Sequence, residues 1–237
     1  MKLGILGTGM IVKDLMNIID MLDIESIYIL GTVNTKEETE GLKEKYHLDK
    51  TYYDYDELLA SDVDTIYVAL PNHLHFSFSK KALEASKHVI IEKPITSNYS
   101  ELKELKRIAE ERNLIILEAM TVHYLPAYQA VKESIHKLGN IKIVSLNYSQ
   151  YSSRYNAFKE GNILPAFDYT KSGGALMDLN VYNIHFIVGL FGKPKNVHYY
   201  PNIGITRFKL STKNPIALKM YESFGFKEDE NAKKMKM

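Results

Sequence analysis

Lys93 stands in a sequence setting that favours chemistry on a carbonyl group. It follows an apolar run over residues 88–91, with Glu92 before it and Pro94 after it. We interpret the run as a buried parallel strand, and open α/β sheets bind ligands in the crevice at the carboxyl ends of such strands. Proline restricts the backbone just after the lysine. An ammonium group held at this place can orient a carbonyl oxygen or donate a proton to it.

A glycine turn near the start of the chain indicates nucleotide binding. Residues 2–6 form a short apolar run, the turn Gly7-Thr8-Gly9 follows, and a helical pattern begins directly afterwards. A G-x-G turn between a strand and a helix lets the backbone approach a pyrophosphate. Val12 replaces the third glycine of this fingerprint, so a purely structural turn is the alternative. The residues predicted to bind the pyrophosphate are Gly7, Thr8, Gly9, Met10 and Ile11.

Strand-like and helix-like segments alternate over residues 1–118, which predicts an α/β fold with a doubly wound parallel sheet of the Rossmann type. Strands are expected near 2–6, 26–31, 64–69, 88–91 and 114–118, and helices near 10–22, 36–46, 73–86 and 99–112. Later segments predict a helix over 124–138, a strand over 141–148, a polar loop over 152–172 and a helix that Gly173-Gly174 opens. We therefore expect a Rossmann domain over 1–118 and an α+β second domain over 119–205.

The end of the second predicted strand bears on the choice between NAD and NADP. In this fold that end meets the adenosine ribose, and a carboxylate there selects the free 2′-hydroxyl of NAD. Val33 and Asn34 occupy this place, and neither is acidic. Lys36 offers a cation for a 2′-phosphate, although a solvated lysine in the first turn of a helix is the more ordinary interpretation. Both cofactors stay open, with a slight preference for NADP.

Composition argues against several classes of partner and site. The chain has 30 basic and 29 acidic residues and a net charge of +1, which argues against nucleic acid as a partner. No apolar run approaches the ~18 residues of a membrane helix, and the first residues resemble a strand rather than a signal peptide. The lack of cysteine excludes thiolate metal sites and fits a cytoplasmic location. His73 and His75 have no third ligand in a motif, so we expect no metal.

Several stretches together resemble the Gfo/Idh/MocA family of NAD(P)-dependent oxidoreductases. The matching stretches are residues 4–9, residues 63–72 with His75, Ala82-Leu83 with residues 87–94, and residues 173–182. The resemblance covers about residues 1–205 and implies further contacts with the cofactor. The implied contacts are Asn34, Leu70, Pro71, Asn72, His75, Glu92 and Lys93. Helix capping by Asn72 and packing by His75 are compatible structural roles.

The family resemblance also assigns roles to the helix after Gly173-Gly174, which faces the nicotinamide in the family. Asp178 and Tyr182 are four residues apart and share one face of that helix. The resemblance implies that Lys93 polarises the substrate oxygen, Tyr182 relays the proton and Asp178 orients the substrate or Lys93. A phenol beside an ammonium has its ionised form favoured, which suits proton transfer. A tyrosine at a domain interface is the alternative, and His123 and His185 are secondary candidates.

The resemblance implies hydride transfer between NAD(P) and a hydroxyl or carbonyl group of a sugar, polyol or diol, with a small molecule as substrate. The sequence does not identify that substrate. Two alternatives stay open, namely an inactive nucleotide-binding remnant and an N-acetyltransferase.

The C-terminal stretch departs from the family, whose members are substantially longer. Residues 206–226 resemble the last motif of GNAT-type N-acetyltransferases, with Asn214, Ala217, Tyr221 and Gly225-Phe226 in place. An ordinary strand–helix segment with Asn214 as its N-cap is the alternative. We interpret 206–237 as an acetyltransferase-like tail fused to a truncated oxidoreductase, whose activity is expected to be impaired. A sheet that lacks strands exposes its edges, so we expect a homo-oligomer formed through the second domain.

Overall fold

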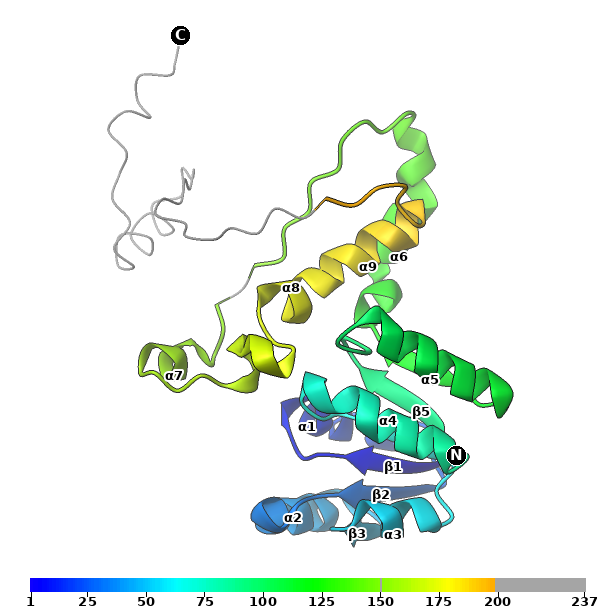
Figure 1. Cartoon of the computed structure of the whole chain (residues 1–237), viewed down its shortest axis with the longest axis vertical. Helices are drawn as coiled ribbons and strands as arrows, with labels where there is room; N and C mark the ends of the chain where they lie inside the picture. The colour runs from blue at the N-terminus through cyan, green and yellow to red at the C-terminus, as the bar shows by residue number, and fades with distance from the viewer. Residues whose placement is uncertain (150, 199–237) are drawn as a thin grey trace. The chain divides into compact units, whose positions relative to one another are not determined.

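The computed structural model describes residues 1–149 and 151–198 (Figure 1). One compact unit spans Met1–Pro194, and Lys195 begins a second. The tail predicted over 206–237 lies outside the described residues, as does the end of the domain predicted over 119–205. The glycine turn and Lys93 both belong to the first unit.

Six parallel strands form the sheet at the centre of this unit. Their order is β3-β2-β1-β4-β5-β6, and every neighbouring pair runs parallel. The strands are β1 (Lys2–Leu6), β2 (Ser26–Leu30), β3 (Lys50–Tyr52), β4 (Thr65–Val68), β5 (His88–Glu92) and β6 (Ile116–Ala119). This order is that of the Rossmann fold, which opens a crevice where the order reverses between β1 and β4. The predicted doubly wound sheet is confirmed, and β3 is a strand that the sequence pattern did not show.

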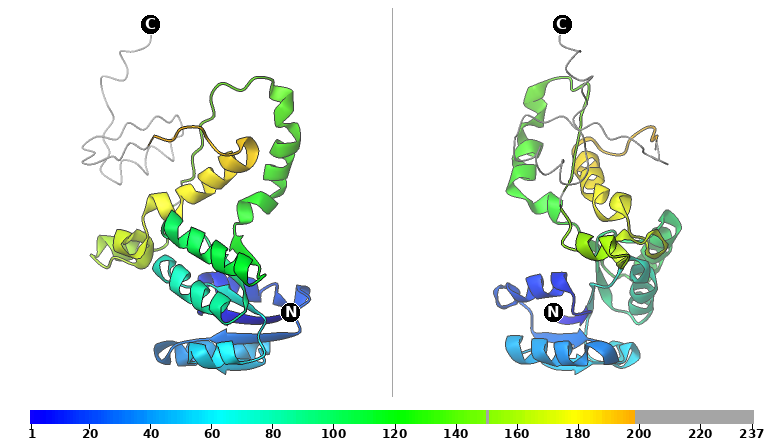
Figure 2. Two further views of the ribbon diagram at one scale, coloured as in Figure 1. Left: turned by 45° about the vertical axis from the view of Figure 1, so that its right-hand side comes forward. Right: turned by 90° about the vertical axis from the view of Figure 1, so that its left-hand side faces the viewer.

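A helix connects each pair of consecutive strands. These helices are α1 (Met10–Met16), α2 (Lys36–Tyr46), α3 (Tyr55–Ala60), α4 (His75–Glu84) and α5 (Tyr99–Glu111). Figures 1 and 2 show α4 and α5 side by side. Helix α1 is shorter than predicted, and a separate 3-10 turn (Ile19–Met21) follows it. Among the described residues, no helix is long and apolar enough to cross a membrane.

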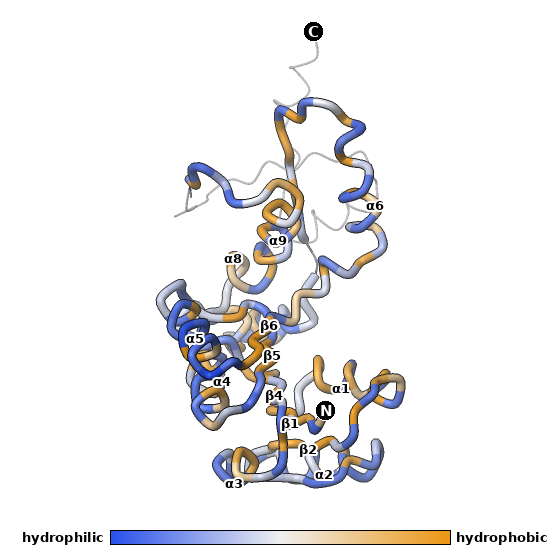
Figure 3. Tube along the Cα trace, turned by 90° about the vertical axis from the view of Figure 1, so that its right-hand side faces the viewer, coloured by the Kyte–Doolittle hydropathy of each residue, from blue (hydrophilic) through white to orange (hydrophobic). Residues whose placement is uncertain are grey.

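Apolar residues of the strands divide the core between the two faces of the sheet. Successive side chains of a strand point to opposite faces, so Leu6 and Ile66 pack in one buried cluster, whereas Ile5 and Ile29 pack in the other. Figure 3 shows β1, β2 and β5 as largely hydrophobic. Val12 of α1 is fully buried in the second cluster. The replacement of the third glycine by valine is explained by this burial, because the side chain adds to the core.

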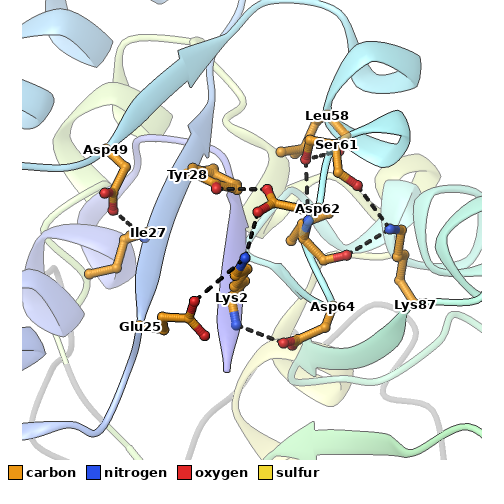
Figure 4. Close-up of polar contacts among 11 residues, drawn as sticks. Lys2, Glu25, Ile27, Tyr28, Asp49, Leu58, Ser61, Asp62, Asp64 and Lys87 are labelled. Carbon is orange, nitrogen blue, oxygen red and sulfur yellow. Dashed lines mark hydrogen bonds and ion pairs between the residues drawn. The ribbon is translucent and has the colours of Figure 1, made fainter.

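A polar network closes the amino ends of the central strands (Figure 4). The Lys2 ammonium lies 2.6 Å from the Asp62 carboxylate, and the Tyr28 hydroxyl donates to the same carboxylate at 2.7 Å. The backbone N–H of Lys2 donates to Asp64 at 2.8 Å. The hydrogen bond from Lys2 holds the pKa of Asp62 below its usual value. These contacts tie together β1, β2 and the segment before β4, at the edge opposite the crevice.

Beyond β6, the strand predicted over 141–148 is wrong. Residues 141–149 have no regular secondary structure, and Ile143 is 87% exposed. A strand needs a neighbour to pair with its backbone N–H and C=O groups. No strand of the described sheet pairs with this segment. Its alternating apolar residues therefore do not form a strand there.

Helices make up the regular structure described after β6. They are α6 (Pro126–Ser134), α7 (Tyr155–Lys159), α8 (Ala175–Asp178) and α9 (Asn180–Phe191), with short 3-10 turns among them. Helix α6 and the 3-10 turn Ile135–Leu138 confirm most of the helix predicted over 124–138, whereas α7 lies within the predicted polar loop. The helix predicted after Gly173-Gly174 is interrupted at Leu179. Asp178 and Tyr182 therefore lie on two consecutive helices.

Leu58 of α3 is fully buried, and its truncation should destabilise the fold. We expect Leu58→Ala to lower the free energy of unfolding by about 2–5 kcal/mol, because a cavity adds to the lost transfer free energy. Leu138→Ala is the matched control, since Leu138 is 73% exposed, and should change that free energy by less than about 0.5 kcal/mol. Urea denaturation followed by circular dichroism measures both. Equal effects would contradict the packing of α3 against the sheet.

Candidate active site

Two glycines shape the turn between β1 and α1 in different ways. Gly7 has a φ of +102°, and a Cβ there would lie 2.8 Å from the carbonyl oxygen of Ala69. Both the backbone conformation and the lack of space require glycine. A Cβ on Gly9 would meet nothing within 4 Å. The turn therefore presents an open side at Gly9, while Thr8 between the two glycines is largely buried.

Apolar side chains are exposed around this turn. Met10 and Ile11 at the start of α1 are 63% and 40% exposed, and Val33 after β2 is 81% exposed. Asn34 follows in the 3-10 turn after β2 and is also exposed. Because β1 and β2 are adjacent parallel strands, the predicted pyrophosphate residues and Asn34 lie at the same edge of the sheet.

A carboxylate that the sequence analysis missed lies beside the glycine turn. Glu38, in the first turn of α2, accepts a hydrogen bond from the Thr8 hydroxyl at 2.8 Å and forms an ion pair with Lys13. The hydrogen bonds from Lys13 and Thr8 hold the pKa of Glu38 below its usual value, so the group is ionised at neutral pH. The end of β2 itself carries no acidic residue, whereas Glu38 reaches back to the glycine turn from the helix that follows. Its place in that first turn is the signal that could have found it.

His75 braces the loop after β4 against the loop after β5. It is fully buried, with Nδ1 2.8 Å from the carbonyl oxygen of Pro94 and Nε2 2.8 Å from the carbonyl oxygen of Leu70. Burial lowers the pKa of His75. This position corresponds to the packing role that the sequence left open, and direct contact of His75 with a cofactor stays a proposal.

Asn72 links the loop after β4 to the segment before α8. Its side-chain amide donates to the carbonyl oxygen of Ser172 at 2.8 Å, and the hydroxyls of Ser172 and Ser97 lie 2.6 Å apart. The predicted helix cap by Asn72 is wrong, because Pro71 is the cap residue of this 3-10 turn and no side chain caps it. The Asn72 amide is instead engaged with Ser172. These contacts hold the segment before α8 against both loops.

Lys93, just after β5, pairs with Asp178 at the end of α8. Its ammonium lies 2.8 Å from Oδ1 and 3.1 Å from the backbone carbonyl oxygen of Asp178, and the two side chains are 18% and 28% exposed. Burial lowers the pKa of Lys93, but the hydrogen bond and the charge of Asp178 raise it by more, so the net direction is upward. Lys93 is therefore a fixed ammonium rather than a base at neutral pH.

Tyr182 of α9 lies beside Lys93. The ammonium is 5.1 Å from the centroid of the Tyr182 ring, which stacks on Tyr148 with centroids 4.7 Å apart and an interplanar angle of 14°. As expected, Lys93 favours the ionised phenol by lowering the pKa of Tyr182, but this is not the larger effect. Burial raises the pKa of Tyr182 by more than Lys93 lowers it. The phenol is therefore protonated at neutral pH and can donate its proton.

The Glu92 carboxylate is hydrogen-bonded to the neighbouring strand of the sheet. Its Oε1 accepts a hydrogen bond from the Tyr67 hydroxyl on the neighbouring strand. Burial and the Glu92 charge raise the pKa of Tyr67. Glu92 thus supports the end of β5 from within the structure, and contact with a cofactor stays a proposal.

His123 and His185 form a separate cluster with Glu118. Nε2 of His185 lies 3.0 Å from Oε2 of Glu118, and its Nδ1 lies 3.1 Å from Nε2 of His123. Burial, with the neighbouring His185, lowers the pKa of His123. The cluster joins β6 to α9. Within residues 1–149 and 151–198, no group of three His, Cys, Asp or Glu side chains could hold a metal ion.

Half of the chain matches a known family. Residues 1–120 match the family model described as an oxidoreductase family with an NAD-binding Rossmann fold, GFO_IDH_MocA. The chain is 35% identical over 198 residues to a scyllo-inositol 2-dehydrogenase (NADP(+)) from Bacillus subtilis, a match that covers 83% of this chain and 60% of that protein. It is 25% identical over 203 residues to a trans-1,2-dihydrobenzene-1,2-diol dehydrogenase from Sus scrofa, covering 83% and 58%. The chain thus spans less than two thirds of the length of these relatives.

Solved structures with the same fold include a dehydrogenase and a reductase. A scyllo-inositol dehydrogenase from Lactobacillus casei with bound NAD(H) and scyllo-inositol has a TM-score of 0.69 at 22% identity, over 81% of this chain and 56% of that chain. A 3-ketoreductase from Actinomadura kijaniata in complex with NADP and TDP-benzene has a TM-score of 0.67 at 25% identity, over 81% and 57%. At 22% identity the first likeness shows the fold alone.

Asp178→Asn should lower the pKa of the Lys93 ammonium, because it removes the partner charge and leaves the burial. The rate at which an acylating reagent modifies Lys93, followed by mass spectrometry against pH, reports that pKa. Modification should begin at lower pH in the variant than in the wild type. Asp168→Asn removes a carboxylate that pairs with Lys171 instead and is the matched control. An unchanged Lys93 profile in Asp178→Asn would contradict the ion pair.

Proposed function

Because the chain belongs to the Gfo/Idh/MocA family of oxidoreductases with an NAD-binding Rossmann fold, we propose that it transfers a hydride between NAD(P) and a hydroxyl or carbonyl group of a sugar, polyol or diol. The observation that carries this proposal is the grouping of Lys93, Asp178 and Tyr182 at the carboxyl end of the sheet. The polyol and diol dehydrogenases among the similar proteins support the substrate class.

The residues at the crevice fit a dinucleotide. The open side at Gly9 supports binding, because a pyrophosphate in this fold approaches the backbone of the turn without an intervening side chain. We assign the phosphates to Gly7, Thr8, Gly9, Met10 and Ile11, the adenosine to Asn34, and the nicotinamide end to Leu70, Pro71, Asn72, His75, Glu92 and Lys93. When bound, the nicotinamide supplies the hydride chemistry, and the protein supplies orientation and protons.

Lys93 and Tyr182 would have different roles in the reaction. The Lys93 ammonium, fixed by Asp178, would orient the substrate oxygen and stabilise negative charge on it. The protonated Tyr182 would donate its proton to that oxygen as a carbonyl is reduced to a hydroxyl. Because the pKa of Tyr182 is raised, the phenol holds its proton at neutral pH, which is the form that donation requires. Oxidation of a hydroxyl requires the reverse proton transfer, so the rate of oxidation should rise at higher pH.

The alternative functions have no specific observation in their favour. The N-acetyltransferase interpretation rests on residues 206–226, which lie outside the described residues. An inactive remnant would bind dinucleotide without turnover, so the rate measurement below separates it from an enzyme. Impaired activity of this chain likewise stays a prediction that the same measurement decides.

We also propose a cytoplasmic protein that self-associates through residues 119–205. Helix α9 supports association, because its apolar residues Ile184, Val188 and Phe191 are 46%, 39% and 47% exposed, and exposed apolar patches bind partners. Light scattering of the purified chain measures the assembly, and a monomer at tens of micromolar would rule out this mode of association.

Gly9→Asp should abolish dinucleotide binding, because it places a side chain and a negative charge against the pyrophosphate. Gly41→Asp on α2 is the matched control, since a Cβ there also meets nothing within 4 Å, and it should leave binding intact. Calorimetric titration with NADH and NADPH measures both variants and the wild type. Absence of heat from the wild type with either dinucleotide at millimolar concentration would refute cofactor binding.

Lys93→Met should remove most turnover while leaving dinucleotide binding nearly intact, and Tyr182→Phe should lower the rate on the order of 10²–10⁴-fold. NADPH and NADH absorbance with a panel of keto-sugars and inosose-type ketones reports the rate. Lys106→Met and Tyr99→Phe are the matched controls, because both side chains are exposed on α5. Turnover of Lys93→Met equal to that of the wild type would show that the lysine is only structural.

A further inference from the structure

The Glu38 carboxylate lies beside the glycine turn, on the helix that follows β2, and the end of β2 is where this fold receives the adenosine of a dinucleotide. It accepts the Thr8 hydroxyl at 2.8 Å, so it is tied to the glycine turn that follows β1. Helix α2, which carries it, follows β2 directly after a 3-10 turn. In Rossmann folds an acidic group near the end of β2 accepts the ribose hydroxyl of NAD. The structure thus supplies from α2 the carboxylate that is missing at the end of β2.

The charge state and the geometry of Glu38 leave it able to act on a ligand. Hydrogen bonds from Lys13 and Thr8 hold its pKa below the usual value, so the group carries its negative charge. One oxygen accepts from Thr8 and the other from Lys13. A carboxylate has about four lone-pair sites, so capacity for a further donor remains. The side chain is 39% exposed and can be reached from solvent.

The two lysines nearby that could receive a 2′-phosphate, Lys13 and Lys36, already have partners. Lys13 is paired with Glu38 itself. The Lys36 ammonium lies over the ring of Tyr53, 5.7 Å from its centroid. Glu37 adds a second negative charge to the first turn of α2. A 2′-phosphate placed here would meet a fixed carboxylate and would have to compete for both cations, whereas a ribose hydroxyl needs only an acceptor.

We infer that Glu38 makes this chain select NAD over NADP, an inference that rests on the dinucleotide binding proposed above. The carboxylate accepts the free 2′-hydroxyl and repels the phosphate that replaces it in NADP. The similar dehydrogenase from Bacillus subtilis is described as using NADP(+). The inference therefore separates this chain from that relative in its cofactor.

Calorimetric titration of the full chain with NADH and NADPH tests the inference without turnover. The wild type should bind NADH at least roughly tenfold more tightly, the ratio expected for one nearby like charge at the surface. Glu38→Gln keeps the size and the acceptor oxygen but removes the charge, and it should shrink this ratio roughly tenfold, mainly through tighter NADPH binding. Glu37→Gln makes the same charge change one residue away and should change the ratio less than about twofold.

A double variant, Glu38→Gln with Lys13→Met, separates two ways in which Glu38 could act. If the double variant still binds NADPH more tightly than the wild type, the Glu38 carboxylate repels the phosphate directly. Loss of this tighter binding would assign selection to Lys13 and would overturn the direct role of Glu38. NADPH binding as tight as NADH binding in the wild type overturns the inference alone, whereas binding of neither dinucleotide overturns the proposed function with it.

Discussion

The ion pair between Lys93 and Asp178 is the interaction on which the candidate site depends. It joins the end of a central strand to a helix that lies 85 residues further along the chain. Moving two charges out of water costs free energy, and a good hydrogen-bond geometry must offset that cost. Lys93 meets both the carboxylate and the backbone carbonyl of Asp178. Without Asp178, burial would act on the pKa of the Lys93 ammonium without this opposing charge and would lower it.

Contacts outside the ion pair hold in place the two segments that carry Lys93 and Asp178. Ser172 accepts the Asn72 amide through its carbonyl oxygen and meets Ser97 through its hydroxyl, which fixes the segment that leads into α8. Gly173 is needed there because a Cβ would lie 2.1 Å from the carbonyl oxygen of Pro165. His75 fixes the two loops on the Rossmann side. The geometry at Lys93 therefore results from several neutral hydrogen bonds rather than from the charge pair alone.

Burial and charge contribute with different weights to the pKa values of Lys93 and Tyr182. For Lys93 the charge of Asp178 outweighs burial, whereas for Tyr182 burial outweighs the charge of Lys93. Both pKa values rise, so both groups hold their protons at neutral pH. A site with two proton donors stabilises negative charge on an oxygen, as carbonyl reduction requires. The Lys93 charge alone, without the burial, would shift the pKa of Tyr182 downward instead of upward.

Local patterns in the sequence determined the alternating strands and helices, the glycine turn and the placement of Lys93 at a strand end. Each of these depends on neighbours within a few residues, so periodicity and turn chemistry are enough. The tertiary structure alone decided the rest. It brought Glu38 to Thr8 and gave Tyr182 its burial, and it left residues 141–149 without a partner strand among residues 1–149 and 151–198. Such features depend on groups far apart in the chain, whose distance, dielectric surroundings and pairing exist only once the chain is folded.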